Sequence, residues 1–247
     1  MSQQSNTTLY LYVLVLTVLS GAGLSLFYNS LKDIHTANKK NAKKADILSA
    51  IPELGKIEDP SAIFKERVTI LAVKADGTIL DDLAKINTEE RKPIAYSDLA
   101  DIDLATEDKL DMDKRVYPVY QYKGNTGQNF YIVAVRGNGL WDKIWGYIAL
   151  ESDLNTIAGI YFGHKAETPG LGAEIKDSKD FKAKFVKKQI YKGDKYVSVL
   201  VKKKIRDKEH EIATISGATV TSDGVSEMMD RGIKNYLAYF EQTKVPK

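Results

Sequence analysis

A long apolar stretch near the start of the chain is followed by shorter apolar runs separated by polar residues. Residues 8–28 read TLYLYVLVLTVLSGAGLSLFY and contain no acidic or basic side chain. About 20 such residues, rising 1.5 Å each, cross a hydrocarbon core of about 30 Å. Tyr10, Tyr12 and Tyr28 lie near the ends of the stretch, where aromatic side chains with polar tips favour the membrane interface. The pattern predicts one membrane-spanning helix.

A cleaved signal peptide is the alternative interpretation of this stretch. Against cleavage, no basic side chain precedes the apolar run and no A-x-A-like site follows it. We therefore expect an uncleaved anchor. A single span cannot form an ion pathway by itself, so any transport role requires partner subunits.

Short runs rich in Val, Ile and Tyr, bounded by Gly, Asn or Asp, follow the anchor and predict β-strands. They cover residues 67–74, 117–123, 130–136, 145–151, 156–162, 196–201 and 211–215. The residues SDLN at 152–155 separate two of these runs and predict a hairpin. Strands in the middle of the chain with helices toward its ends predict an α+β fold with a mainly antiparallel sheet.

The clearest soluble helix lies at the C-terminus, from Ser222 onward. Apolar residues recur there at steps of three and four, and Ser222 or Asp223 is positioned to cap the first turn. The recurring residues are Val225, Met228, Met229, Ile233, Leu237 and Phe240. This pattern predicts one amphipathic helix packed on the sheet.

Two polar segments complete the organisation of the chain. Residues 36–52 are polar and Ala-rich, which predicts a helix or stalk next to the membrane. The acidic stretch 97–114 lacks the ligand spacing of an EF-hand loop, so we expect a solvated helix or loop there. We therefore divide the chain into an N-terminal region with the anchor (1–31), a stalk (32–60) and a soluble domain (61–247).

Composition excludes several classes of function. The chain has 36 Lys and Arg against 33 Asp and Glu, so a phosphate-tracking nucleic-acid binder is not expected. Without cysteine, it has no disulfides, thiolate nucleophiles or Cys-ligated metals. The three histidines form no metal-binding pair, Ser216 lacks the first Gly of a nucleophile elbow, and no dinucleotide fingerprint is present. We expect neither catalytic side chains nor a metal site.

Two Gly-rich segments are not explained by packing. Residues 163–174 follow a strand, and their tight loop would let backbone N–H groups approach a ligand closely. An ordinary turn is the alternative. Residues 215–224 lead into the amphipathic helix, whose free N–H groups would suit a phosphate. A Ser- and Thr-rich capping loop is the alternative there.

Three short motifs occur in these segments and just before them. They are SGAT (Ser216, Gly217, Ala218, Thr219), ETPGLG (Glu167, Thr168, Pro169, Gly170, Leu171, Gly172) and GLW (Gly139, Leu140, Trp141). With these motifs in this order, the chain resembles the FMN-binding domain of the C subunit of Na⁺-translocating NADH:quinone reductases. The related G subunit of the Rnf complex shares the SGAT motif.

The resemblance implies a covalent FMN, attached by a flavin transferase through a phosphoester to Thr219. The ETPGLG and GLW residues, together with Ser216, Gly217, Ala218 and Ser222, would form the FMN site. Gly170 and Gly172 would bring backbone donors to the flavin edge, while Leu171 and Trp141 would cover its apolar face. For Trp141 a buried core position is the alternative. Many family members have an Asp where this chain has Ala213.

The resemblance also implies an electron-transfer role. The chain would relay electrons within the inner membrane complex, together with its A, B, D, E and F subunits, without binding NADH or conducting Na⁺ itself. Its domain would face the periplasm, although the lysines after the anchor favour the cytoplasm by the positive-inside rule. These lysines would also contact membrane lipid. An Rnf-type subunit and a membrane-anchored sensor or binding module without a redox cofactor are the alternatives.

Overall fold

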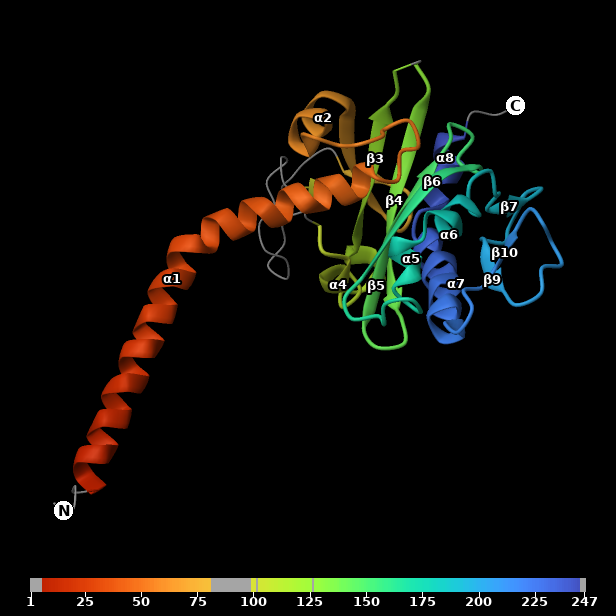
Figure 1. Cartoon of the computed structure of the whole chain (residues 1–247). Helices are drawn as coiled ribbons and strands as arrows, with labels where there is room; N and C mark the ends of the chain where they lie inside the picture. The colour runs from red at the N-terminus through yellow and green to blue at the C-terminus, as the bar shows by residue number, and fades with distance from the viewer. Residues whose placement is uncertain (1–5, 81–98, 101, 126, 245–247) are drawn as a thin grey trace. The chain divides into compact units, whose positions relative to one another are not determined.

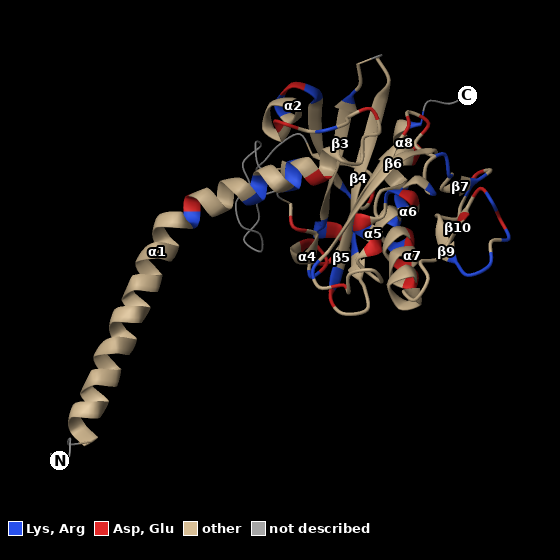
Figure 2. Cartoon of the chain, viewed as in Figure 1, with Lys and Arg blue, Asp and Glu red and all other residues tan. Residues whose placement is uncertain are grey.

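The structure is a computed structural model that describes residues 6–80, 99–100, 102–125 and 127–244. The chain forms two compact units, one up to Lys43 and one from Lys44 onward. The first unit is most of helix α1 (Asn6–Leu48), which contains the predicted span and has the length and composition to cross a membrane. Its first turns carry no charged side chain (Figure 2). Residues 36–52, predicted as a helix or stalk, are helical as far as Leu48, where α1 ends.

The second unit is built on a six-stranded antiparallel sheet with the order β2-β1-β3-β4-β5-β6 (Figure 1). Its strands are β1 (Val68–Lys74), β2 (Ile79–Leu80), β3 (Val116–Lys123), β4 (Asn129–Asn138), β5 (Lys143–Leu150) and β6 (Ile157–His164). Five of the predicted strands are therefore confirmed to within a few residues, and so is the hairpin between β5 and β6. The α+β fold with a mainly antiparallel sheet is confirmed.

Two small sheets lie outside the main one. Strands β7 (Tyr191–Lys192) and β8 (Lys195–Tyr196) form a hairpin, and β9 (Leu200–Lys202) pairs in parallel with β10 (Glu211–Ala213). The single strand predicted over 196–201 is wrong. The chain turns at Ser198, whose φ of 61° is incompatible with an extended strand.

Helices cover both faces of the main sheet. They are α2 (Pro60–Arg67), α4 (Leu104–Glu107), the 3₁₀ helix η2 (Met112–Lys114), α5 (Glu174–Asp177), α6 (Lys179–Ala183), α7 (Thr219–Lys234) and α8 (Leu237–Thr243). The C-terminal amphipathic pattern thus forms two helices rather than one. The acidic stretch is only partly solvated, because Glu107 is buried and accepts a hydrogen bond of 2.8 Å from the Val116 N–H. Its residues 97, 98 and 101 lie outside the described residues.

Each sheet face buries a different core, because side chains alternate along a strand. Val133 and Val135 of β4 point into the cluster that holds Met228 and Ile233 of α7. Ile132 of β4 belongs to the cluster on the opposite face. That cluster also contains Phe64 of α2 and, from the end of α1, Ile47 and Leu48. The sheet is therefore the central layer, and α7 lies on the face that carries the candidate site.

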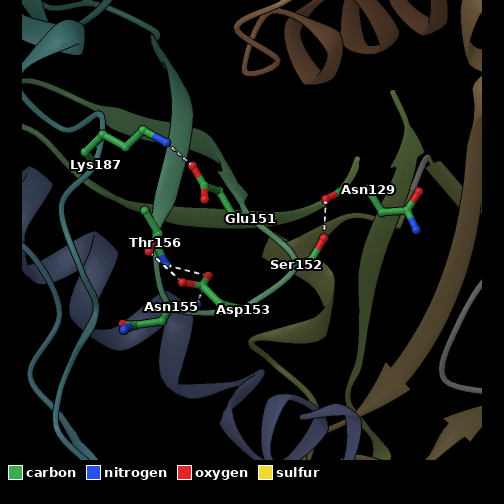
Figure 3. Close-up of polar contacts among 7 residues, drawn as sticks. All are labelled: Asn129, Glu151, Ser152, Asp153, Asn155, Thr156 and Lys187. Carbon is green, nitrogen blue, oxygen red and sulfur yellow. Dashed lines mark hydrogen bonds and ion pairs between the residues drawn. The ribbon is translucent and has the colours of Figure 1, made fainter. Parts of the chain in front are cut away.

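Asp153 organises the turn between β5 and β6 (Figure 3). Its carboxylate accepts hydrogen bonds from the N–H groups of Asn155 and Thr156, both at 2.9 Å, and from the Thr156 hydroxyl at 2.6 Å. Partial burial raises the pKa of this carboxyl, but the three hydrogen bonds outweigh burial and leave the pKa below its usual value.

Replacing Asp153 with alanine should lower the free energy of unfolding at pH 7 by about 1 kcal/mol, since charge-assisted hydrogen bonds are lost from a partly solvated turn. Because the pKa of Asp153 is lower in the folded chain than in the unfolded one, the ionised carboxylate stabilises the fold. This stability is fully present above the unfolded carboxyl's pKa of about 3.9, and it is lost as the pH falls through the folded pKa. Urea unfolding at pH 7 and pH 3 should show the difference from wild type shrinking in acid. Ser152→Ala, which removes a non-titrating hydrogen bond to the Asn129 carbonyl, is the control, and its effect should not depend on pH.

Candidate functional site

Three loops meet at the beginning of α7. They are the β4–β5 loop at 139–142, the segment 165–173 after β6, and residues 214–218 after β10. Together they enclose a cavity of about 190 Å³, below the roughly 300–1,000 Å³ of sites that enclose a small ligand. The cavity is lined by Leu140, Glu167, Thr168, Leu171, Gly172, Gly217, Ala218, Thr219, Val220 and Thr221. The three predicted motifs therefore converge in space, on a site that holds only part of a large ligand.

Glu167 joins its own loop to the β4–β5 loop and to the first turn of α7. One carboxylate oxygen, Oε1, accepts a hydrogen bond of 3.0 Å from the backbone N–H of Trp141. The other, Oε2, accepts one of 2.6 Å from the Thr221 hydroxyl. Glu167 is 5% exposed. A Cβ on Gly139 would lie 2.4 Å from Oε1, and one on Gly172 would lie 2.3 Å from Oε2. Because these two glycines have no Cβ, the Glu167 carboxylate fits between the segments that line the cavity. Its hydrogen bonds then hold those segments in place.

Thr219 is the first residue of α7. The residue before it, Ala218, makes no side-chain cap, and among the described residues the N–H groups of Thr219, Val220 and Thr221 donate to no protein group. A helix N-terminus with free N–H groups and a positive dipole end favours an anion. The first turn of α7, where Thr219 lies, therefore has the free N–H groups that favour an anion.

The predicted cap of this helix is wrong. Ser222 and Asp223 lie inside α7, three and four residues after its start. Ser222 is buried, and its hydroxyl accepts a hydrogen bond of 3.3 Å from the Ile215 N–H. Ser222 therefore fastens the preceding segment to the helix and does not line the cavity.

Gly217 joins two of the motifs. Its φ of +76° is a conformation that residues with a Cβ rarely adopt, and a Cβ there would lie 2.8 Å from Leu171 Cδ2. Ser216 beside it is exposed and, like Pro169 and Gly170, does not line the cavity. Of the two predicted backbone-donor glycines, only Gly172 borders the cavity.

Four large apolar side chains are exposed at this site. They are Leu140 (52% exposed), Trp141 (66%), Leu171 (42%) and Val220 (55%). The core position considered for Trp141 is therefore wrong. Its indole N–H donates to the Thr168 hydroxyl at 3.1 Å, which positions the ring. A cluster of exposed apolar groups beside a cavity marks a binding surface.

Charge at the site is modest. Lys165 pairs with Asp142 at 2.9 Å, and this contact lowers the pKa of the Asp142 carboxyl, with help from the Lys143 N–H. Ala213, where the resemblance noted from the sequence implies an Asp in many family members, is the last residue of β10 and pairs with Lys202. Val220 and Thr221 also line the cavity, although the motifs did not predict them. Their positions directly after the SGAT motif were the available signal.

Comparisons with known proteins agree with the three motifs. Residues 139–234 match a family model described as an FMN-binding domain. The chain is 32% identical over 240 residues to the C subunit of the Na(+)-translocating NADH-quinone reductase of Pseudomonas aeruginosa, covering 92% of this chain and 91% of that protein. It is 34% identical over 223 residues to the protein of the same name from Neisseria meningitidis serogroup B, covering 87% and 85%.

Solved structures show the same similarity. The crystal structure of the C subunit of the Na(+)-translocating NADH-quinone reductase from Parabacteroides distasonis superposes with a TM-score of 0.72 at 30% identity, covering 85% of this chain and 96% of that one. The structure of Shewanella oneidensis NqrC gives a TM-score of 0.64 at 28% identity, covering 84% and 99%. Both fold and sequence therefore extend the similarity well beyond the three motifs.

Proposed function

Because this chain belongs to the family of C subunits of the Na(+)-translocating NADH-quinone reductases, we propose that it carries FMN bound covalently through a phosphoester to Thr219. Membership makes the chain part of an oxidoreductase complex, with an FMN-binding domain over residues 139–234. The observation that carries the proposal is the position of Thr219, at the start of α7 and in the wall of a cavity bordered by exposed apolar side chains.

The residues around Thr219 fit the parts of FMN. A phosphate on the Thr219 oxygen would be held by the free N–H groups of the first turn of α7. The cavity is too small for the whole cofactor, so the flavin ring would lie outside it, against the exposed apolar side chains. These are Leu140, Trp141, Leu171 and Val220.

The bound FMN would supply the electron-transfer chemistry, while the chain sets its position and surroundings. A covalent bond suits an open site, because an open site buries little of the ligand and would otherwise release it. No side chain needs to move a proton for this role.

Peptide mapping tests the proposal. The full chain, produced with a flavin transferase, should stay fluorescent after denaturation and gel electrophoresis. Trypsin should release the flavin on the peptide of residues 209–231, and fragmentation should place it on Thr219 rather than on Thr214, Ser216, Thr221 or Ser222. A non-fluorescent chain from cells with an active transferase would support a binding module without a redox cofactor instead.

We also propose that α1 anchors the chain in the bacterial inner membrane, next to partner subunits, with the domain in the periplasm. The apolar span and the membership in a membrane complex support the anchor. Lys32, Lys39 and Lys40 after the span argue for the opposite orientation. Protease added to right-side-out spheroplasts should digest the domain, whereas full protection would place it in the cytoplasm.

A further inference from the structure

A second cavity, of about 300 Å³, lies near the other end of α7, and three arginines are among its lining residues. The chain has only six arginines among its 36 basic residues, and three of them, Arg115, Arg136 and Arg231, border this one cavity. Arg231 follows Thr219 by 12 residues, which along a helix corresponds to about 18 Å. The cavity shares no lining residue with the site at Thr219.

The fold brings these arginines together from three separate segments. Arg115 precedes β3, Arg136 lies near the end of β4, and Arg231 lies in the last turns of α7. Close packing of α7 on β4 depends on Gly232, where a Cβ would lie 2.6 Å from Val135 Cγ1. This close approach places Arg231 at the edge of β4, where its Nη2 lies 3.5 Å from the Arg136 carbonyl oxygen.

Backbone carbonyls hold the guanidinium groups of Arg115 and Arg231, and the one acidic residue of the lining does not neutralise the three arginines. Arg115 donates to the carbonyl oxygens of Leu110 at 2.8 Å and Asp108 at 3.1 Å, so backbone contacts hold its side chain. Arg231 has one distant ionic partner, Glu227 at 3.9 Å. Within the described part of the chain, the Arg136 guanidinium makes no hydrogen bond or ion pair. Asp108 is the single acidic residue in the lining, which leaves the lining with a net charge of +2.

We propose that this cavity binds a phosphate group, either as the free ion or on a small organic molecule. Guanidinium groups present several N–H donors in a planar fork, which matches the oxygens of a phosphate. The Asn235 side chain adds an amide donor, and Leu104, Ala134 and Val135 supply an apolar wall for the organic part of an ester. The C-terminal dipole of α7 opposes an anion only weakly, because it is screened by solvent and by the arginines.

The direct test is thermal unfolding of the full chain in detergent, loaded with FMN so that the Thr219 site is occupied. Inorganic phosphate at ten times its Kd should raise the unfolding midpoint by about 3–6 °C over chloride of equal ionic strength. The double variant Arg136→Gln/Arg231→Gln should lose this rise. Arg206→Gln, which removes an arginine outside the cavity, should keep it.

An equal rise in the double variant, or no rise in the wild type, would overturn the proposal. Because the double variant can fail to fold, arginine modification of the wild type by phenylglyoxal gives an independent test. Phosphate should protect Arg136 and Arg231 but not Arg206, and equal modification of all three would also overturn it. Glycerol 3-phosphate distinguishes the source: tighter binding than inorganic phosphate indicates an organic ester, and equal binding indicates the free ion.

Discussion

Replacing Thr219 with valine should abolish covalent flavin attachment completely, while the chain still folds. Valine has nearly the shape of threonine but no hydroxyl, and the phosphoester requires that oxygen. Thr219 is only half-buried, and among the described residues its hydroxyl makes no hydrogen bond, so the substitution removes no internal hydrogen bond that stabilises the helix. The readout is flavin fluorescence of the denatured band, with the intact mass as confirmation.

Two matched variants separate attachment from folding. Thr219→Ser keeps a hydroxyl and should keep some flavin, whereas Ser216→Ala removes an exposed neighbouring hydroxyl in the same motif and should keep nearly all of it. Persistent fluorescence in the Thr219→Val chain would assign the flavin to another residue. A melting midpoint equal to that of the wild-type chain without flavin would show that the fold is intact.

Glu167→Ala should destabilise the domain by about 2–5 kcal/mol and strongly reduce flavin attachment. The substitution leaves the buried Thr221 hydroxyl and the partly buried backbone N–H of Trp141 without their acceptor, and an unsatisfied donor costs about 1–3 kcal/mol when it is fully buried. The β4–β5 loop and the first turn of α7 would then lose their common partner. Chemical unfolding measures the stability, and in-gel fluorescence measures the attachment.

Glu174→Ala is the control, since Glu174 is a nearby glutamate in the first turn of α5 and does not line the cavity. It should change stability by less than about 1 kcal/mol and leave the attachment intact. If Glu167→Ala behaved like Glu174→Ala, the carboxylate would not hold the site together. If attachment fell without a loss of stability, Glu167 would instead interact with the flavin or the transferase.

Local patterns in the sequence predicted most of the secondary structure of the sheet domain. The runs that became β1, β3, β4, β5 and β6 alternate or cluster apolar residues over several positions, and strand formation there follows from burial on both faces of the sheet. The turn at Ser198 escaped prediction because a positive φ at a serine leaves no compositional signal.

The start of α7 also could not be predicted from capping residues. Ser222 has the chemistry of a cap, but its hydroxyl accepts from the Ile215 N–H in a loop that folds back over the helix. The Thr221 hydroxyl likewise donates to Glu167, 54 residues earlier in the chain. Both hydroxyls therefore form hydrogen bonds with residues outside the helix and do not cap it. The helix begins three residues before Ser222, at Thr219.

The sequence by itself determined the anchor, the sheet strands and the three motifs, because each depends on residues close together in the chain. Only the tertiary structure decided which of the predicted residues share a cavity. Its lining includes Val220 and Thr221 but not Trp141, Pro169, Gly170, Ser216 or Ser222. It alone gathered the three arginines at the second cavity. Residues tens of positions apart in the sequence come into contact only when a sheet and a helix pack closely. That packing depends on how side chains from distant segments fit together, which no local sequence pattern specifies.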